Sequence, residues 1–439
     1  MDRRVSPEEW RRRALEVTPG GVMSGFRASD DPLLAIARGE GAYVHPLDGP
    51  PLLDFWQGGG ANLFGYTPKR IIEAVTEQAK RGFVYVAGFT PYEVLLSESV
   101  VRALPRKEKV LFCAGGGEAI ANAVRVARAY TGRRLILKME GCYHGTGDGL
   151  LVSVAPPADM IGSPYAHSAG ALNAATRATL VCPYNDLDAA GAVLAAHRGQ
   201  VAAVVIEPIL HSCTTIEPEP GYLEGLRTLC DEAGALLIFD EVVSGRHHPG
   251  GYQCIAGVYP DLTAGGKGLS GGLPISYLRG VPHVMEMFNT SSHGSVAWAG
   301  TYNAHPLAVA AALAADELLA DGEIRRHVAA LGERMRAGLA ENVRDFGIED
   351  RATVTGAYSI FCLWFATGPL RNYEDVIRGN RKWFLRYREE EYKRGVYERT
   401  SLDGYGRSHI CAAHTLADVD TALTVSRDAM RAMLKAKRG

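Results

Sequence analysis

The sequence predicts an α/β fold with a large domain around a mostly parallel sheet and a smaller α/β domain assembled from both chain ends. Between about residues 93 and 310, short apolar runs alternate with helical segments, which is typical of a parallel sheet covered on both faces. The chain has 439 residues, more than one compact domain usually holds. We predict that residues 1–55 and 326–439 form the small domain and residues 56–325 the large one.

The first predicted elements belong to the small domain. Residues 6–18 are expected to form a helix, with Ser6 as its N-cap and Glu9 completing a capping box. Residues 33–55 are expected to form short strands around a turn. In the predicted large domain, the spacing of apolar residues predicts a helix over 69–81.

The large domain is expected to alternate buried strands with helices. The strands are expected at 110–113, 135–139, 202–206 and 236–239, and the helices at 119–130 and 223–232. Residues 306–345 are rich in alanine and leucine and are expected to form two helices. The tail, 350–439, is expected to mix short strands with helices at about 372–394 and 416–436.

The composition is that of an ordinary globular protein, with 47% hydrophobic and 22% charged residues. The formal net charge is −2, so no broad attraction to nucleic acid or to an anionic membrane is expected. We find no secretory signal and no apolar run of membrane-spanning length. The eight cysteines are scattered, which predicts reduced thiols in the cytoplasm rather than a disulfide framework or a metal site.

The chemistry is expected to centre on residues 236–274. A buried strand reaches Asp240, which places a carboxylate at the edge where open α/β sheets build their sites. Lys267 lies among glycines, which leave room for a large group bonded to its nitrogen. Pyridoxal 5′-phosphate (PLP) requires a Schiff-base lysine and an acidic partner for its ring nitrogen. A surface lysine and an aspartate that caps a helix explain the same stretch equally well.

Two further stretches follow strands. Gly115, Gly116 and Gly117 open a helix, and such a helix start suits a phosphate because its N–H groups face the anion and glycines permit a close approach. A tight turn without a ligand is the alternative. The ring of Tyr143 is suited to stack on a flat cofactor, with His144 beside it. The plainer interpretation is a tyrosine at the rim of the core with a hydrogen-bonded histidine.

Three isolated residues complete the candidates. Glu207 follows a strand, where it orients polar groups of a cofactor or caps the next turn. Thr301 precedes a helix, where it donates to a phosphate or caps that helix. Arg27 lies in an irregular stretch, and its guanidinium is suited to hold a carboxylate, although a solvated arginine is more common.

These motifs resemble those of the class-III aminotransferases of PLP fold type I, and within them the glutamate-1-semialdehyde aminomutase branch. The resemblance covers nearly the whole chain. The segments that carry it stand in the family's order: PGGV at 19–22, GCYHG at 141–145, FDEV at 239–242 and the GT–HPLA segment at 300–308.

The resemblance implies a role for each residue around the cofactor ring. Lys267 would form the Schiff base and carry a proton between the substrate Cα and the cofactor. Asp240 would pair with the pyridinium nitrogen, while Val242 and Tyr143 would lie on opposite faces of the ring. Glu207 would support the cofactor through neighbouring hydrogen bonds.

The resemblance also implies how the phosphate and the substrate are held. Backbone N–H groups of Gly116 and Gly117 would bind the phosphate, together with Thr301 of the neighbouring subunit. A homodimer with active sites at the subunit interface is therefore expected. Ser24 and Arg27 match the family positions that hold the substrate carboxylate, so an amino acid substrate is expected.

Four departures from the family pattern bear on function. Residues 114–119 lack two hydroxyls of the family's phosphate loop, which predicts weaker cofactor retention than in relatives. Gly59 stands where the aminomutase branch has tryptophan, which predicts a substrate bulkier than glutamate semialdehyde. Residues 245–248 read Gly-Arg-His-His instead of beginning Gly-Phe-Arg, and the adjacent histidines do not suggest a metal. Asp403 is a loose match for an acid of the aminomutase.

The predicted function is a PLP-dependent aminotransferase that acts through a Lys267 Schiff base and a pyridoxamine intermediate, with an amino acid and a keto acid or aldehyde as substrates. An aminomutase or an amino-acid racemase or epimerase would share the first steps. Another PLP reaction and a non-catalytic PLP-binding relative are further alternatives.

Overall fold

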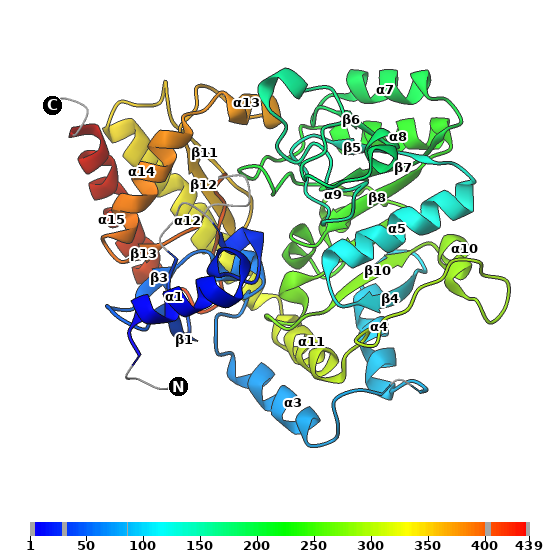
Figure 1. Ribbon diagram of the computed structural model, residues 1–439, viewed down its shortest axis with the longest axis horizontal. Coiled ribbons are helices and arrows are strands. Elements are labelled where there is room, and N and C mark those ends of the chain that lie inside the picture. Colours follow the sequence, from blue (N-terminus) through cyan, green and yellow to red (C-terminus); the bar gives the residue numbers. More distant parts are fainter. Residues whose placement is uncertain (1–4, 29–32, 86, 400–404, 436–439) are drawn as a thin grey trace. The chain divides into compact units, whose positions relative to one another are not determined.

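The structure is a computed structural model that describes residues 5–28, 33–85, 87–399 and 405–435, and its chain forms two compact units (Figure 1). Unit 1 comprises residues 1–68, 327–369 and 378–439, and unit 2 comprises residues 69–326 and 370–377. The domain boundaries expected from the sequence remain a prediction. They differ from the compact units at two segments.

Residues 56–68 belong to unit 1, and residues 370–377 belong to unit 2. The first segment is tied to unit 1 because the backbone N–H of Ala412 donates to the carbonyl of Leu63 at 2.8 Å. The second is tied to unit 2 because the hydroxyl of Tyr373 donates to the carbonyl of Pro156 at 2.8 Å. These contacts join segments far apart in the sequence.

Unit 2 is built on a seven-stranded sheet in the order β4-β10-β9-β8-β7-β5-β6. Only β10 runs antiparallel to its neighbours, so the predicted fold with a mostly parallel sheet is confirmed. Strands β6, β9 and β10 were not among the predicted strands. The strands are β4 (Lys109–Cys113), β5 (Leu135–Met139), β6 (Thr179–Cys182), β7 (Val201–Ile206), β8 (Leu236–Glu241), β9 (Leu262–Gly265) and β10 (Ser276–Gly280).

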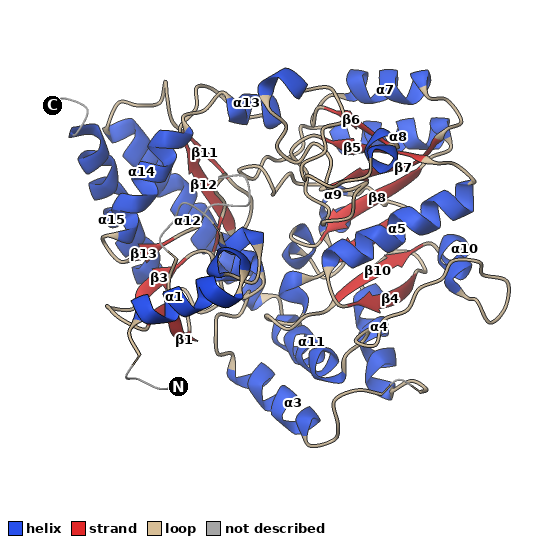
Figure 2. Ribbon diagram, in the orientation of Figure 1, coloured by secondary structure: helices blue, strands red, loops and turns tan. Residues whose placement is uncertain are grey.

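Helices cover both faces of this sheet (Figure 2). Along β4, Leu111 faces the core beneath α5 (Gly116–Thr131), while the next residue, Phe112, faces α4 (Pro91–Arg102) and α11 (Pro306–Leu319). The other helices of unit 2 are α3 (Lys69–Ala79), α6 (Asn173–Arg177), α7 (Leu187–Ala196), α8 (Tyr222–Ala233), α9 (Tyr252–Ala256), α10 (Pro282–Met285) and α13 (Tyr373–Ile377).

Unit 1 contains two small sheets and several helices. The sheet orders are β1-β2-β3-β13 and β11-β12-β14. The strands are β1 (Ile36–Glu40), β2 (Tyr43–Pro46), β3 (Leu52–Asp54), β11 (Thr353–Thr355), β12 (Ile360–Trp364), β13 (Val396–Tyr397) and β14 (Ser408–His409). The helices are α1 (Pro7–Val17), α2 (Gln57–Gly60), α12 (Glu323–Asp345, the last four-fifths of which lie in this unit), α14 (Arg381–Tyr392) and α15 (Leu416–Lys435).

Only one of the two hydrogen bonds of the predicted capping box of α1 is present, so that prediction is wrong for the other. The Ser6 hydroxyl accepts from the N–H of Glu9 at 3.2 Å, as expected. The Glu9 carboxylate does not return to Ser6 because it accepts two hydrogen bonds from the guanidinium of Arg12, one turn further along the helix. Among the described residues, no helix has the length and apolarity needed to cross a membrane.

Candidate active site

Five strands of unit 2 bring their following residues to one edge of the sheet. Gly115–Gly117 follow β4, residues 140–145 follow β5, and Glu207 follows β7. Asp240 lies near the end of β8, and Lys267 follows β9. Strands β4, β5, β7, β8 and β9 run in the same direction, so their carboxyl ends meet at this edge, where open α/β sheets bind ligands.

Two of the three glycines at the start of α5, Gly116 and Gly117, are packed too closely for side chains. A Cβ on Gly116 would lie 2.6 Å from Cγ2 of Val242. A Cβ on Gly117 would lie 3.0 Å from Cα of Gly145, so two backbones touch at that point. Gly116 and Gly117 are the first two residues of α5, and their N–H groups have no partner within the helix. The turn therefore presents two backbone donors and the positive end of the helix dipole.

Asp240 and His144 form a buried pair behind this turn. Nδ1 of His144 lies 2.8 Å from Oδ2 of Asp240, and Oδ1 of Asp240 accepts from the N–H of Val242 at 3.1 Å. The two side chains are almost fully enclosed. When the carboxylate is ionised it only accepts, so Nδ1 of His144 carries the hydrogen. His144 was predicted to be hydrogen-bonded, and its partner is Asp240, the residue predicted to pair with the ring nitrogen of the cofactor.

Glu207 fastens the segment that carries Tyr143. One carboxylate oxygen accepts from the N–H of Tyr143 at 2.8 Å. The other accepts from the N–H groups of His211 and Ser212, each at 3.0 Å. The carboxylate is therefore engaged by main-chain donors. In this geometry Glu207 acts on the site by holding Tyr143 in place.

Lys138 is a member of this arrangement that the sequence reasoning missed. It lies in β5 with no exposed surface, and its Nζ donates to the carbonyls of Cys142, at 2.9 Å, and of Val152. Burial lowers its pKa to about 8, against the opposing charges of Cys142, Glu207 and Glu140. The buried amine fixes the main chain immediately before Tyr143. A lysine inside the apolar run 135–139 was the available signal.

Lys267 follows β9 in a left-handed backbone conformation, with φ +46°. Few residues other than glycine adopt this conformation, and those that do often lie at functional sites. The neighbouring Gly265 lies against the ring of Tyr277, since a Cβ there would approach that ring to 2.2 Å. The turn that carries Lys267 is thus fixed by a flat contact between β9 and β10.

Comparison with known proteins agrees with this geometry. The family model described as aminotransferase class-III matches residues 25–350. The chain belongs to the class-III aminotransferases. The family resemblance predicted from the motifs is confirmed, and so is the assignment as a PLP-dependent enzyme.

Three relatives of this chain illustrate the range of the family. A glutamate-1-semialdehyde 2,1-aminomutase of Methanopyrus kandleri is 35% identical over 410 residues, which cover 93% of each chain. An omega-transaminase of Sphaerobacter thermophilus has a TM-score of 0.91 at 32% identity, covering 100% of this chain and 99% of that one. A β-phenylalanine aminotransferase of Variovorax paradoxus has a TM-score of 0.86 at 27% identity, covering 96% of this chain and 92% of that one.

The residues of this site fit PLP. Gly116 and Gly117 form a cradle that side chains would fill, and their N–H groups suit the phosphate. The buried carboxylate of Asp240 suits a ring nitrogen that carries a proton. Gly115 has no atom within 4 Å of an added Cβ, so the hydroxyl-bearing residue that the family places there has room. The described residues contain no group of three or more potential metal ligands among His, Cys, Asp and Glu.

The remaining predicted residues belong to other segments of the chain, and Ser24, Arg27 and Gly59 are part of unit 1. Thr301 is exposed on this chain, in the turn before α11. Ser24 and Arg27 bracket a short helical turn of unit 1, where the N–H of Arg27 donates to the carbonyl of Ser24 at 2.8 Å. Gly59, also in unit 1, has φ +67°, and a Cβ there would lie 3.4 Å from the ring of Trp56. Asp403 lies outside the described residues.

Proposed function

We propose that this enzyme is an aminotransferase that takes the amino group of an amino acid and transfers it to a keto acid or aldehyde. The observation that carries the proposal is the buried pair of Asp240 and His144 at the strand edge from which Lys267 also emerges. PLP, when bound, supplies an electron-accepting ring that stabilises the charge left when a proton leaves the substrate Cα. Transamination requires this charge to be stabilised while the amino group is transferred from the substrate to the cofactor.

Each residue has a proposed task. Lys267 would bond to the cofactor as a nucleophile and then carry the proton to and from the substrate Cα. Asp240, oriented by His144, would keep the ring nitrogen protonated. Tyr143 and Val242 would confine the ring between them. Tyr143 is suited to this because its main chain is held by Glu207.

The phosphate and the substrate would be held by other groups. Gly116 and Gly117 would donate their N–H groups to the phosphate, and Thr301 of a second copy of the chain would complete the site in a homodimer. Ser24 and Arg27 would hold the carboxylate of the amino acid. All eight cysteines are free, which supports a cytoplasmic location.

We infer a donor bulkier than glutamate semialdehyde, because Gly59 offers no side chain where the aminomutase branch has tryptophan. The ring of Trp56 occupies part of that space, so the room gained is smaller than a whole indole. The likeness to a β-phenylalanine aminotransferase makes β-phenylalanine a good first donor to test. The identity of 35% to an aminomutase favours the alternative, a reaction whose product keeps the amino group.

Mixing the PLP-loaded protein with a panel of L-, D- and β-amino acids, without a keto acid, distinguishes transamination from a reaction whose product keeps the amino group. We expect loss of the visible absorbance band together with one equivalent of keto product from a bulky donor. A racemase or an aminomutase would instead release no keto acid, and a racemase would exchange the Cα proton for solvent deuterium. That result would reject transamination.

A further inference from the structure

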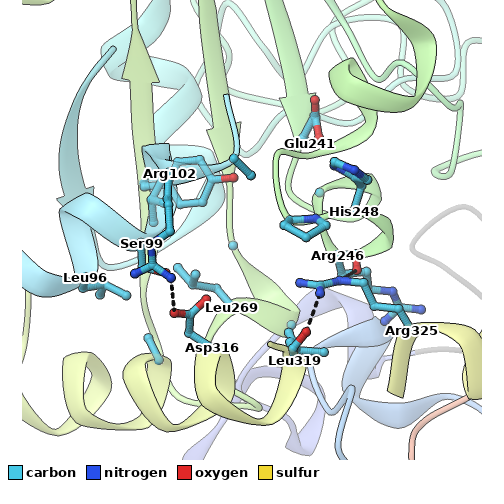
Figure 3. A pocket seen from close by; sticks show the side chains of 18 of the residues that line it. Leu96, Ser99, Arg102, Glu241, Arg246, His248, Leu269, Asp316, Leu319 and Arg325 are labelled. Carbon is cyan, nitrogen blue, oxygen red and sulfur yellow. Dashed lines mark hydrogen bonds and ion pairs between the residues drawn. The ribbon is translucent and has the colours of Figure 1, made fainter. Parts of the chain in front are cut away.

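Unit 2 contains a pocket whose lining includes sequence neighbours of Lys267 (Figure 3). Its volume is about 280 Å³, and its wall includes Gly266 and Gly268, the two neighbours of Lys267, as well as Glu241, the neighbour of Asp240. The side chain of Lys267 is not part of this wall. The space greatly exceeds the roughly 30 Å³ that one water molecule occupies in the liquid. A small organic or inorganic ligand therefore fits.

Positive charge predominates in this pocket. Three arginines line it, Arg102, Arg246 and Arg325, against two acids, Glu241 and Asp316. His248 also lines it, and burial together with the charge of Arg325 lowers the pKa of that imidazole. Near neutral pH the imidazole is uncharged, so the wall has one positive charge in excess.

Both acids are already engaged. The carboxylate of Asp316 lies 3.7 Å from the guanidinium of Arg102. The carboxylate of Glu241 accepts from the backbone N–H groups of Tyr252 and Gln253, at 2.6 and 3.0 Å. The charge of Asp316 also acts on Arg325, but it does not offset the effect of burial on the pKa of that guanidinium.

The other two cations of the pocket are Arg246 and Arg325, which Figure 3 shows together across from Arg102. Arg246 is only 8% exposed. Arg325 donates from Nε to the carbonyl of Arg246, at 3.3 Å, and from Nη1 to the carbonyl of Leu319, at 2.8 Å. Within the described ranges, no carboxylate lies within 4 Å of the Arg325 guanidinium. The Arg325 guanidinium therefore has neutral main-chain acceptors, in a pocket that Arg246 also lines.

Desolvation of the Arg325 guanidinium is unfavourable, and a bound anion would offset it. Burial lowers the pKa of Arg325, and the charge of Asp316 does not offset that effect. A desolvated guanidinium is strongly stabilised by an oxyanion, which it can bind with two parallel hydrogen bonds. Arg246 also stands at the phenylalanine position of the family's Gly-Phe-Arg pattern.

We propose that this pocket binds a small oxyanion, a dicarboxylate or a phosphate, between Arg246 and Arg325. A ligand held there would contact the main chain on both sides of Lys267. The pocket would then act as an effector site, because the side chain of Lys267 is not part of its wall. The proposal does not depend on the reaction assigned to the enzyme.

Calorimetric titration of the PLP-loaded enzyme with inorganic phosphate, and separately with malonate, tests the proposal. Saturating the enzyme with PLP keeps the probe out of the cofactor's phosphate site. We expect saturable binding of at least one probe, and the tighter of the two identifies the anion as a phosphate or a dicarboxylate. Absence of binding by both probes would overturn the proposal.

Three variants locate the site. Arg246→Phe and Arg325→Gln are each expected to weaken binding by at least about tenfold, as the loss of a charge-assisted hydrogen bond predicts. Arg134→Gln removes one exposed positive charge elsewhere in unit 2 and is expected to leave binding unchanged. Thermal unfolding verifies that each variant is folded, and Arg325, which is less buried, provides the test should Arg246→Phe fail to fold. Equal binding by the parent and the folded pocket variants, or an equal loss in Arg134→Gln, would refute the site.

Discussion

Replacing Lys138 with methionine tests whether a buried amine organises the cofactor site. The Nζ of Lys138 donates to the carbonyls of Cys142 and Val152, and the side chain has no exposed surface. Methionine keeps most of the length of the side chain and removes the donor. We expect the main chain before Tyr143 to lose its fixed position. Cofactor affinity should then fall by about tenfold, which corresponds to one lost hydrogen bond of a charged donor.

The same change has a distinct pH signature. Burial lowers the pKa of Lys138 from 10.5 to about 8. Between these values the unfolded chain holds a proton that the folded chain has released, so the free energy of unfolding rises with pH by up to about 1.4 kcal/mol per pH unit. The whole window is therefore worth about 3 kcal/mol. Below about pH 8 the amine is protonated in both states and its contribution is constant.

Thermal unfolding midpoints of the two PLP-loaded proteins, recorded from pH 7 to pH 10, measure this term. For a unit of this size, 1 kcal/mol shifts the midpoint by about 2 °C. We therefore expect the parent to gain about 5 °C on the variant over this range. Every other titrating group, Lys267 included, is common to both proteins and cancels. Midpoints that run parallel with pH would refute an abnormal pKa for Lys138.

Three further changes test the cofactor site. Lys267→Ala is expected to lose the visible absorbance band and turnover together, and normal turnover of the folded variant would remove the central claim. Gly117→Ala brings a Cβ to 3.0 Å from Cα of Gly145, so cofactor affinity should fall by at least about tenfold in a PLP titration. Gly115→Ala, whose Cβ meets no atom within 4 Å, is its matched control, and equal losses in both would contradict the cradle. Gly115→Ser adds a hydroxyl, and a neutral hydrogen bond of about 1 kcal/mol predicts about fivefold tighter PLP binding and slower loss on dialysis than in the parent. An unchanged affinity would show that this hydroxyl does not reach the phosphate.

The residues at the strand ends were predictable because their signals are local. An apolar run that ends in a carboxylate, as at Asp240, marks both a buried strand and the polar group at its end. The glycines at 115–117 mark a strand–helix turn in the same way. The sheet order was less accessible, because β10 contributes an antiparallel strand between β4 and β9 that no local pattern distinguishes.

Contacts between distant segments were not predictable in this way. The glycines at 117 and 145 require one another, since neither tolerates a Cβ against the backbone of the other, yet they lie on different loops. Lys138 stands within an apolar strand, and its importance appears only when the carbonyls of Cys142 and Val152 fold around its amine. The sequence indicated the residues that we propose contact the cofactor, whereas the groups that position them became visible only in the packing.

This difference bears on the altered phosphate loop. Two hydroxyls are absent from residues 114–119, but the donors that remain belong to the main chain, and main-chain donors are effective only when their position is fixed. The contacts of Gly116 with Val242 and of Gly117 with Gly145 fix that position from two sides. Lys138 and Glu207 bind the main chain of Cys142 and Tyr143, in the loop that also contains Gly145. A phosphate loop with few side-chain donors depends more on the contacts that fix its main chain. For this reason we expect the largest losses of cofactor affinity from substitutions of Gly117 and Lys138.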